Sequence, residues 1–291
     1  QNLISIENIT SEGAADLTIF DTSGVNVITT NTGNDTIHSK GGNDTITTAA
    51  GNDTVYLGNG TYTVDLGAGD DKVYLTTTAS SIDGNTGSDE AIVRAFDGFV
   101  DVYIDLQFST YFVPSKLTAQ DGMEVSLQNF EKVTIDGNVA STILGTSAAD
   151  TLTGDGGADV ITGRGGADTL TGGSRSDKFV FNSGDTGITE ATADTITDFS
   201  TGTDKIDLVS LATYVEADGT STADLAAFIT AANASLTTNS NDIYAQFNFK
   251  GGGNTLVVVD ENKSGTVNAG DTLIILSGLS TAGGLDGSDF I

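Results

Sequence analysis

A strict nine-residue period near the start of the chain constrains the fold more than any other feature. The segment TGNDTIHSKGGNDTITTAAGNDTVY, residues 32–56, repeats Gly-Asn-Asp-Thr, and Asp35, Asp44 and Asp53 lie nine residues apart. An α-helix returns to the same face about every 3.6 residues and a strand every two, so neither element alone explains this spacing. The period therefore indicates a repeating unit that stacks on its neighbours, as in a solenoid.

The same frame extends along the chain and recurs further on. With Asp as position 6, position 8 is aliphatic in eight successive units: Ile19, Ile28, Ile37, Ile46, Val55, Val64, Val73 and Ile82. A second array has Asp150, Asp159, Asp168 and Asp177 at position 6, and Leu152, Ile161, Leu170 and Phe179 at position 8. Its glycines are Gly154, Gly163 and Gly172 at position 1, and Gly157 and Gly166 at position 4. Two arrays in register indicate two stretches of one architecture.

These units resemble the G-G-x-G-x-D-x-U-x nonapeptide of RTX (repeats-in-toxin) proteins, a calcium-binding β-helix repeat. The resemblance implies a right-handed parallel β-roll, in which six residues of each unit form a turn, three form a strand, and two units complete a coil. It also implies that Ca²⁺ lies between coils, held by turn carbonyls and Asp carboxylates, which suit a hard cation. We therefore expect an all-β fold: a calcium-binding parallel β-roll in two arrays, with a mainly β C-terminal cap that carries one short helix.

Alternate units should lie on opposite edges of the roll, so an ion is shared between residues eighteen apart. On one edge of the first array, position 6 forms an acidic column of Asp35, Asp53, Asp71 and Asp89. On the other edge it reads Asn26, Asp44, Tyr62 and Ser80, which predicts closure mainly by side-chain packing, with Asn26 and Asp44 kept as candidate ligands. Four aspartates give room for three ions. In the second array, Asp150 with Asp168, and Asp159 with Asp177, would hold one ion each.

Electrostatics indicates that the acidic column needs its cation. Two carboxylates about 4.8 Å apart repel by roughly 3 kcal/mol at an effective dielectric of about 20. The chain has a net charge of −29, and 32 of its 40 acidic residues are Asp, which favours ligand turns over a merely solvated acidic surface. Only 11 Lys and Arg argue against nucleic-acid binding. The absence of cysteine excludes disulfides and thiolate metal sites.

The repeats divide the chain into four expected parts: a first β-roll over 1–92, a β bridging segment over 93–140, a second β-roll over 141–185 and a C-terminal cap over 186–291. In the bridging segment, GFVDVYIDLQFS and EKVTIDG alternate apolar and polar residues, which predicts antiparallel strands around Pro114. STADLAAFITAANASL, residues 221–236, predicts the helix, with Ser221 and Asp224 resembling a capping box.

The start of the cap, ADTITDFSTGTDKIDL, is similar to the segment that follows the last repeat in RTX proteins of the serralysin and surface-layer kinds. It would cover the open end of the roll. Its acidic residues are either further ligands or solvated turn residues, and the sequence leaves both open: Asp194, Asp198, Asp204 and Asp207.

Residues 260–271, DENKSGTVNAGD, have the oxygen spacing of a calcium loop. The candidate ligands are Asp260, Asn262, Ser264, the Thr266 carbonyl and Asp271. Position 12 is Asp where Glu is usual, and the flanking segments predict strands where an EF-hand has helices. A bound ion and a plain hairpin both remain open.

The termini bear on export. The last residues, LSGLSTAGGLDGSDFI, are similar to the uncleaved signal that type I (ABC-type) exporters read in RTX proteins. A start at Gln1 suggests the C-terminal piece of a longer protein, and no apolar run approaches the roughly 20 residues that span a bilayer.

Catalysis is not expected, since the one histidine, His38, should face outward and no H-E-x-x-H motif is present. We expect a secreted, extracellular region of a bacterial surface-layer protein or adhesin. Its partners would be copies of itself, cell-surface polysaccharide, and the ABC-type exporter during secretion. The alternative is the secretion and folding module of a secreted hydrolase or toxin.

Overall fold

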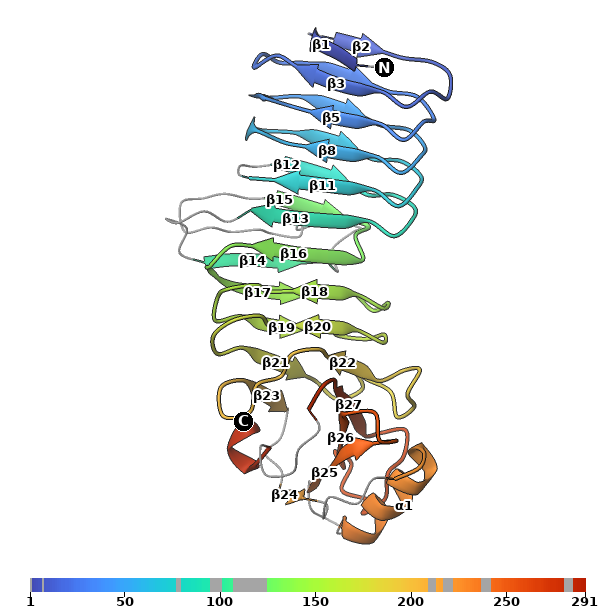
Figure 1. The fold of residues 1–291 in the computed structure, drawn as a ribbon, viewed down its shortest axis with the longest axis vertical. Helices are drawn as coiled ribbons and strands as arrows, with labels where there is room; N and C mark the ends of the chain where they lie inside the picture. The colour runs from blue at the N-terminus through green and yellow to red at the C-terminus, as the bar shows by residue number, and fades with distance from the viewer. Residues whose placement is uncertain are drawn as a thin grey trace. The chain divides into compact units, whose positions relative to one another are not determined.

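The computed structural model describes residues 2–6, 8–76, 80–94, 101–106, 125–208, 213–216, 222–236, 242–279 and 285–291. The chain forms two compact units, Gln1–Thr142 and Ile143–Ile291. Strands dominate both units, and the described residues contain one α-helix (Figure 1). No helix in these ranges is long and apolar enough to cross a membrane.

The first unit is a roll of short parallel strands (Figure 1). One sheet runs in the order β1 (Asn2–Ile6), β3 (Thr18–Asp21), β5 (Thr36–His38), β8 (Thr54–Tyr56), β11 (Lys72–Leu75), β13 (Glu90–Arg94) and β16 (Lys132–Asp136). The other runs β2 (Asn8–Thr10), β4 (Val27–Thr29), β7 (Thr45–Thr47), β10 (Thr63–Asp65), β12 (Ser80–Asp83) and β15 (Val125–Gln128). The short β6 (Gly41–Gly42) and β9 (Asn59–Gly60) pair in a turn, and β14 (Asp101–Asp105) follows β13 in the chain.

The register of this roll follows the nine-residue frame. Ile37 pairs with Ile19 on one side and Val55 on the other, each eighteen residues away. In the second sheet, Ile46 likewise pairs with Ile28 and Val64. The position-8 side chains from Ile19 to Ile82 are at most 2% exposed, so they form the core between the sheets. The predicted β-roll is therefore confirmed.

The strands after residue 92 extend the roll. β15 pairs with β12 and β16 pairs with β13, and both pairings are parallel. The sequence-based prediction of antiparallel strands in this segment is therefore wrong for β15 and β16. The apolar residues of β16, Val133 and Ile135, are both fully buried and stack in line with the core of the coil before it. A long excursion costs little extra closure entropy, so an additional coil can follow it. Pro114 lies outside the described residues.

The second unit begins with the same architecture. β18 (Thr151–Thr153), β20 (Thr169–Thr171) and β22 (Asp194–Ile196) pair in parallel in one sheet. β19 (Val160–Thr162), β21 (Lys178–Phe181) and β23 (Lys205–Leu208) do so in the other, after β17 (Ala140–Leu144) at the border of the units. The pairing of Leu170 with Ile196 and of Phe179 with Ile206 shows that the cap segment continues the coils.

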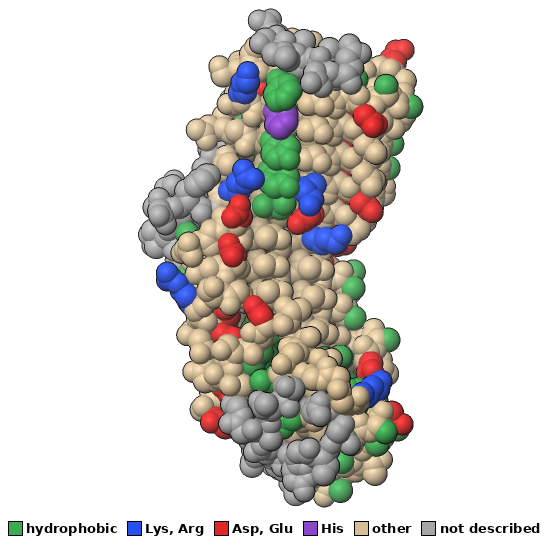
Figure 2. All heavy atoms as spheres, viewed as in Figure 1, with side chains coloured by type: hydrophobic (Ala, Val, Ile, Leu, Met, Phe, Trp, Pro, Cys, Tyr) green, Lys and Arg blue, Asp and Glu red, His purple; other side chains and the backbone are tan. Residues whose placement is uncertain are grey.

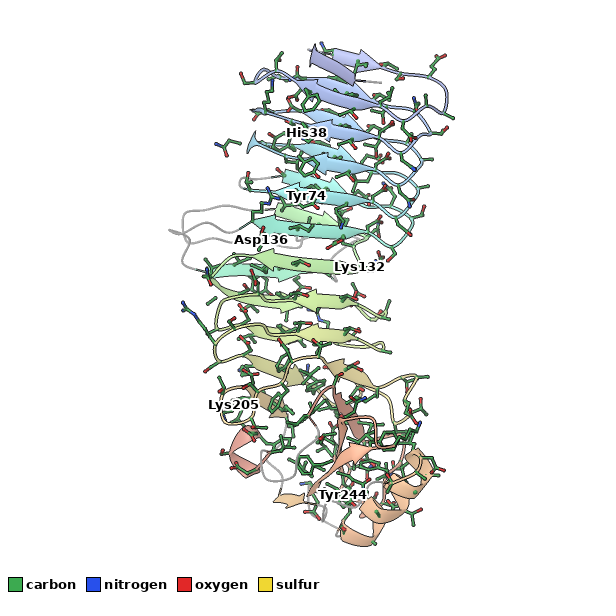
Figure 3. The ribbon with its side chains drawn as sticks, viewed as in Figure 1. His38, Tyr74, Lys132, Asp136, Lys205 and Tyr244 are labelled. Carbon is green, nitrogen blue, oxygen red and sulfur yellow. The ribbon has the colours of Figure 1, made fainter. Side chains whose placement is uncertain are left out.

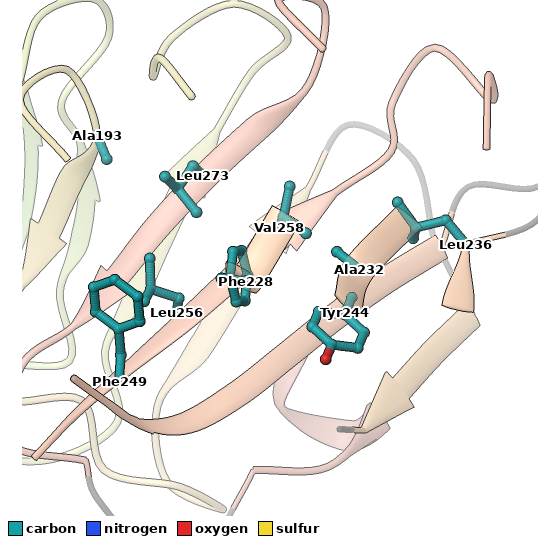
Figure 4. Close-up of a cluster of buried hydrophobic side chains, with 9 residues drawn as sticks. All are labelled: Ala193, Phe228, Ala232, Leu236, Tyr244, Phe249, Leu256, Val258 and Leu273. Atoms are coloured by element: carbon teal, nitrogen blue, oxygen red, sulfur yellow. The ribbon is translucent and has the colours of Figure 1, made fainter. Parts of the chain in front are cut away.

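The cap then changes from parallel to antiparallel pairing. β27 (Thr272–Leu276) lies parallel to β22, and β26 (Asn254–Val259) pairs antiparallel with both β27 and β25 (Asp242–Phe249). β24 (Thr213–Glu216) completes the order beside β25. The helix α1 (Leu225–Ser235) covers this sheet, with Phe228 and Ala232 fully buried against Tyr244 and Leu256 (Figure 4).

Two ends of the cap have defined hydrogen bonds. Asp224 is the N-cap of α1, where its side chain accepts a hydrogen bond from the Ala227 N–H. It is therefore not the third helical residue of a capping box, and Ser221 lies outside the described residues.

At the C-terminus, η1 (Gly287–Asp289) precedes the last two residues, and the Ile291 N–H donates to the Ile206 carbonyl. Residues 285–291, which the sequence suggests as an export signal, are thus docked on β23.

Candidate calcium sites

The first acidic column forms as the parity of the repeat predicts. The backbone N–H of Asp35 donates to Oδ1 of Asp53 at 2.6 Å, that of Asp53 to Asp71 at 2.7 Å, and that of Asp71 to Asp89 at 2.8 Å. Leu17 N–H donates to Asp35 in the same way at 2.8 Å. All four aspartates are at most 2% exposed. The side chains therefore stack in one buried line, eighteen residues per step.

The second carboxylate oxygen in this column has no hydrogen-bond partner. Oδ2 of Asp35, Asp53, Asp71 and Asp89 is buried and makes no hydrogen bond. A buried anionic oxygen without compensation is costly, and a paired cation removes that cost. The line of unpartnered oxygens therefore fits a row of bound cations.

Burial also raises the pKa values of these carboxyls. It is the main cause that raises the pKa of Asp71 to about 7, with repulsion from Asp53 and Asp89 adding to it. Burial likewise raises the pKa of Asp53 to about 6, and that of Asp89 to about 6 with a further contribution from Glu131. Without a cation, the column resists full ionisation.

Glu131 continues this column and is a residue that the sequence did not single out. Its Oε2 accepts from the Asp89 N–H at 2.9 Å, the contact that Asp89 itself provides to Asp71. Glu131 lies 42 residues beyond Asp89 and outside the nonapeptide frame. Only the parallel pairing of β16 with β13 brings it to the column, so no local sequence signal could have found it.

The opposite edge of the first roll is closed by protein hydrogen bonds. Asp44 accepts from Asn26 N–H through Oδ1 at 2.9 Å and from Ser39 Oγ through Oδ2 at 2.8 Å. Ser39 also donates to the Tyr62 hydroxyl at 3.3 Å, and Tyr62 N–H donates to Ser80 Oγ at 3.1 Å. Both oxygens of Asp44 are therefore hydrogen-bonded within the protein, so Asp44 and Asn26, which the sequence offers as candidate ligands, differ in this respect from the first column.

Asp21 is the exception on this edge and was not singled out from the sequence. It is fully buried, accepts from Lys40 N–H at 2.8 Å through Oδ1, and leaves Oδ2 without a hydrogen bond. Burial is the main cause that raises the pKa of Asp21, and repulsion from Asp44 adds to it.

The second unit contains two acidic columns, each one residue longer than predicted. Asp150 N–H donates to Asp168 at 2.8 Å, and Asp168 N–H to Asp194 at 2.9 Å. On the other edge, Asp159 N–H donates to Asp177 at 2.9 Å, and Asp177 N–H to Asp204 at 3.0 Å. The last steps span 26 and 27 residues, so cap residues take the positions of repeat residues.

Burial dominates the titration of these columns as well. It raises the pKa of Asp168 to about 7, that of Asp177 to about 6 and that of Asp194 to about 8. The Oδ2 atoms of these three residues are buried without a hydrogen bond. Their chemistry therefore matches that of the first column.

Glycine at position 1 makes room for each of these carboxylates. A Cβ on Gly163 would lie 2.1 Å from Oδ2 of Asp168, and one on Gly172 would lie 2.4 Å from Oδ2 of Asp177. A Cβ on Gly154 would lie 2.3 Å from Asp159. Any larger residue would fill the space beside the carboxylate oxygen, which is where a cation has to sit.

Position 4 brings turn carbonyls together. Gly166 has a φ of +126°, and a Cβ there would lie 2.4 Å from the Ala148 carbonyl oxygen of the coil before it. Gly157, the corresponding residue of the preceding unit, is buried in its turn. A Cβ on Gly145 would lie 2.5 Å from the Gly163 carbonyl oxygen and 2.6 Å from Asp150 Oδ2, so a turn carbonyl lies next to the column, as a site rich in carbonyl ligands requires.

The remaining acidic residues of the cap have different roles. Asp198 accepts from Gly172 N–H at 3.0 Å and Gly173 N–H at 2.7 Å, so it anchors the turn that contains Gly172. Asp207 lies on β23 and forms an ion pair with Lys178 at 2.9 Å. Asp194 and Asp204 belong to the columns.

Residues 260–271 form the connection between antiparallel β26 and β27. The loop brings Asp260, Asn262, Ser264, Thr266 and Asp271 together through its own hydrogen bonds. The flanking strands are as predicted.

Within the described ranges, no group of three or more His, Cys, Asp or Glu side chains comes together as a metal cluster. Such a cluster is not expected in the columns, because each coil contributes only one carboxylate to an edge. A cation there would take its other oxygen ligands from turn carbonyls. Orphaned buried oxygens and glycine cradles together show that the residues fit Ca²⁺.

His38 lies outside these sites. It stacks between Phe20 and Tyr56 with ring centroids 4.6 Å from each, and Tyr74 continues the ladder at 4.5 Å (Figures 2 and 3). Desolvation lowers the pKa of His38. The ladder forms a stripe on one face of the first unit and takes no part in the acidic columns (Figure 2).

Comparison with known proteins identifies the repeats. A family model described as the RTX calcium-binding nonapeptide repeat (4 copies) matches residues 20–55, 29–64, 40–73 and 144–178. The chain therefore carries RTX calcium-binding repeats, and these repeats bind Ca²⁺. RTX proteins are typically secreted and extracellular.

Other comparisons add little. No curated protein matches the chain in sequence. Among solved structures, the extracellular lipase LipA from Serratia marcescens aligns over 96% of this chain at 13% identity, with a TM-score of 0.23. The chain spans 40% of that lipase. At this TM-score the likeness supports no argument about fold or activity.

Proposed function

We propose that this chain is the calcium-dependent structural region of a secreted bacterial surface-layer protein, and that it folds on Ca²⁺ binding after type I export. The observation that carries the proposal is the buried Oδ2 atoms without a hydrogen bond in the aspartate columns of both units, at Asp35, Asp53, Asp71 and Asp89 in the first and at Asp168, Asp177 and Asp194 in the second. Such columns make the fold depend on a cation that is abundant outside the cell and scarce in the cytosol.

The residues that would hold the ions follow from the columns. In the first unit they are Asp35, Asp53, Asp71 and Asp89, with Glu131 at the end. In the second unit they are Asp150, Asp168 and Asp194 on one edge, and Asp159, Asp177 and Asp204 on the other. Bound Ca²⁺ supplies positive charge to the buried oxygens and cross-links successive coils.

The magnitude of this linkage is sufficient to control folding. A site with a dissociation constant of about 10⁻⁴ M in about 1 mM calcium contributes about 1.4 kcal/mol. Domains are stable by about 5–15 kcal/mol in total. Several such sites therefore decide whether the chain folds.

The first unit is the main support for a surface-layer protein over a secretion module. Its acidic column continues without interruption from Asp35 to Glu131, which is more than a minimal secretion tag requires. The Thr-, Gly- and Ala-rich, cysteine-free and lysine-poor composition is of the kind found in surface-layer proteins. The proposed partners are neighbouring copies in a lattice, cell-surface polysaccharide and, during secretion, an ABC-type exporter. The chain is assigned no catalytic role.

Electron microscopy tests the assembly part of this proposal. The purified chain with millimolar Ca²⁺ should form sheets or higher oligomers, and excess chelator should disperse them. Magnesium should not replace calcium, because its small octahedral shell fits carbonyl turns poorly. A strictly monomeric calcium form would contradict the lattice and favour a secretion and folding module of a hydrolase or toxin.

A further inference from the structure

The hairpin connection between β26 and β27 contains a site that is separate from the acidic columns of the rolls. Val259 and Thr272 pair at its base, so the twelve residues from Asp260 to Asp271 close one loop. Asp260 is fully buried and Asp271 is 2% exposed, although they are the first and last residues of an otherwise mostly exposed loop. The fold therefore places two carboxylates under this loop.

The loop curls around the first of these carboxylates. Asp260 accepts from Ser264 N–H at 3.0 Å and from Gly265 N–H at 2.7 Å, one with each oxygen. Lys263 and Gly265 adopt positive φ values of 59° and 72°. These two turns direct the polar groups of alternate residues toward the inside of the 260–271 loop.

Oxygen atoms at alternate positions converge there. Asn262 Oδ1 accepts from Ser264 N–H at 3.1 Å, and Ser264 Oγ donates to the Thr266 carbonyl at 2.8 Å. Asn268 Nδ2 donates to the same carbonyl at 2.8 Å and to Ser264 Oγ at 2.9 Å. The loop thus gathers amide, hydroxyl and carbonyl oxygens from positions 3, 5 and 7, and the Asn268 side chain at position 9 contacts two of these residues through its amide nitrogen.

Asp271 supplies the observation that points to a ligand. Its Oδ2 accepts from Asn268 N–H at 2.7 Å, whereas its buried Oδ1 has no hydrogen-bond partner. Because Val259 pairs with Thr272, Asp271 lies next to Asp260 at the base of the loop. A second buried oxygen without a partner, Glu261 Oε2, lies on a residue adjacent to Asp260.

We infer that residues 260–271 form an independent calcium site, with Asp260 and Asp271 as the charged ligands. Asn262, Ser264 and the Thr266 carbonyl would complete the oxygen shell, and Asn268 would contribute directly or through a water molecule. The spacing of ligands at positions 1, 3, 5, 7, 9 and 12, with Gly265 at position 6, is that of a twelve-residue calcium loop. Here antiparallel strands hold its ends in place of helices.

The chemistry favours Ca²⁺ over other cations. Every donor is oxygen, which excludes a preference for soft metals. Neutral Asn and Ser at positions 3 and 5 lower the charge of the site, which is typical of calcium modules that work at extracellular concentrations of about 10⁻⁴–10⁻³ M. The ion would join β26 to β27 and so brace the sheet that covers the end of the second roll.

A site-specific probe tests this inference on the full chain. The protein contains no tryptophan, so Thr266→Trp introduces a donor beside the loop that can be excited at wavelengths where the 7 tyrosines do not absorb, and it keeps the backbone carbonyl at this position. Excitation of the introduced tryptophan should sensitise the luminescence of Tb³⁺, and added Ca²⁺ should quench that luminescence by displacement. Adding Asp271→Asn should weaken the apparent Tb³⁺ affinity at least tenfold, whereas Asp136→Asn, a surface carboxylate that pairs with Arg94, should leave it unchanged.

Counting bound Ca²⁺ provides the second measurement. Equilibrium dialysis of the Asp260→Asn/Asp271→Asn variant should show one ion fewer per chain than the unchanged protein, with the same β content by circular dichroism in saturating calcium. If the Thr266→Trp variant gives no sensitised signal, or if the count is unchanged, the inference is wrong. Calcium binding by the roll repeats would still be measured in that case, so the proposed function stands or fails separately.

Discussion

At the scale of single residues, an aspartate of the roll serves two interactions through its two oxygens. In Asp53, Oδ1 accepts the Asp35 N–H, and Oδ2 is buried without a hydrogen bond. Asp44 uses both oxygens in protein hydrogen bonds. The same residue type at the same repeat position is therefore expected to respond differently to calcium on the two edges.

Replacing Asp53 by Asn should change stability in opposite directions with and without calcium. In chelator, the amide keeps an oxygen for Asp35 N–H and removes a buried charge, so the urea midpoint should rise. In calcium, the loss of a charged ligand should lower the free energy of unfolding by roughly 2 kcal/mol, the scale of a charge-assisted interaction. Asp44→Asn is the matched control and should shift both midpoints much less. Equal effects at both positions would contradict the assignment of edges.

The raised pKa values predict how the calcium-free fold depends on pH. Burial raises the pKa of Asp53 to about 6, that of Asp71 to about 7 and that of Asp194 to about 8, all above the ordinary value of 3.8. Between pH 3.8 and about pH 8, these carboxyls bind more protons in the folded state than in the unfolded state. The free energy of unfolding of the calcium-free chain therefore falls as the pH rises.

Thermal unfolding in excess chelator checks this sign. The melting temperature should be highest at about pH 4 and should decrease steadily as the pH rises, until the calcium-free chain is unfolded at about pH 8. In saturating calcium the decrease should be much smaller, because the cation replaces the protons. A calcium-free melting temperature that rises between pH 5 and pH 8 would show that the columns are not buried as described.

At the scale of the repeat element, glycine decides whether a turn can hold a cation. Gly163 and Gly165 are two residues apart in one turn, yet they differ in surroundings. A Cβ on Gly163 would lie 2.1 Å from Oδ2 of Asp168, whereas one on Gly165 would meet nothing closer than 3.7 Å. The two positions therefore form a natural pair of test and control.

Gly163→Ala should weaken calcium binding and lower stability, and Gly165→Ala should be tolerated. For Gly163→Ala we expect a loss of about 1–3 kcal/mol in calcium, the usual cost of overpacking a filled site. Calcium titrations followed by circular dichroism should show a higher midpoint concentration for this variant alone. Similar midpoints for both variants would remove the role assigned to position 1.

At the scale of the whole molecule, the proposed function predicts that the columns couple folding to calcium in both units. With a net charge of −29 and no cation, the chain should expand in chelator at about pH 8, where protons no longer neutralise the buried carboxyls. Its radius of gyration should then approach the roughly 60 Å of an unfolded chain of this length. Small-angle X-ray scattering across a calcium titration should show compaction in the submillimolar to millimolar range. A compact chain in chelator would contradict calcium-dependent folding.

The same coupling bears on export. The C-terminal residues are docked on β23 when the chain is folded, since Leu208 N–H donates to the Ile291 carbonyl at 3.0 Å and Ile291 N–H donates to Ile206. An exporter that reads these residues would therefore require the unfolded state. Low cytosolic calcium would maintain that state, and calcium outside would end it.

The sequence by itself determined the repeat, its register and the edge of each acidic residue. The nine-residue frame places Ile37 beside Ile19 and Val55, and it separates the Asp53 column from Asp44, because side-chain direction in a parallel roll follows directly from repeat position. Calcium as the ligand follows from the same residues. Local periodicity specifies these features, so no distant contact is needed to infer them.

Only the tertiary structure decided which residues outside the frame join the columns. Glu131 extends one column and Asp194 and Asp204 extend two others, across 42, 26 and 27 residues. The parallel pairing of β15 and β16, the N-cap role of Asp224 and the buried, unpartnered oxygen of Asp271 were also beyond the sequence. The physical reason is that the core admits any strand whose apolar residues stack in register, whatever the length of chain between coils, and sequence spacing records only the regular intervals.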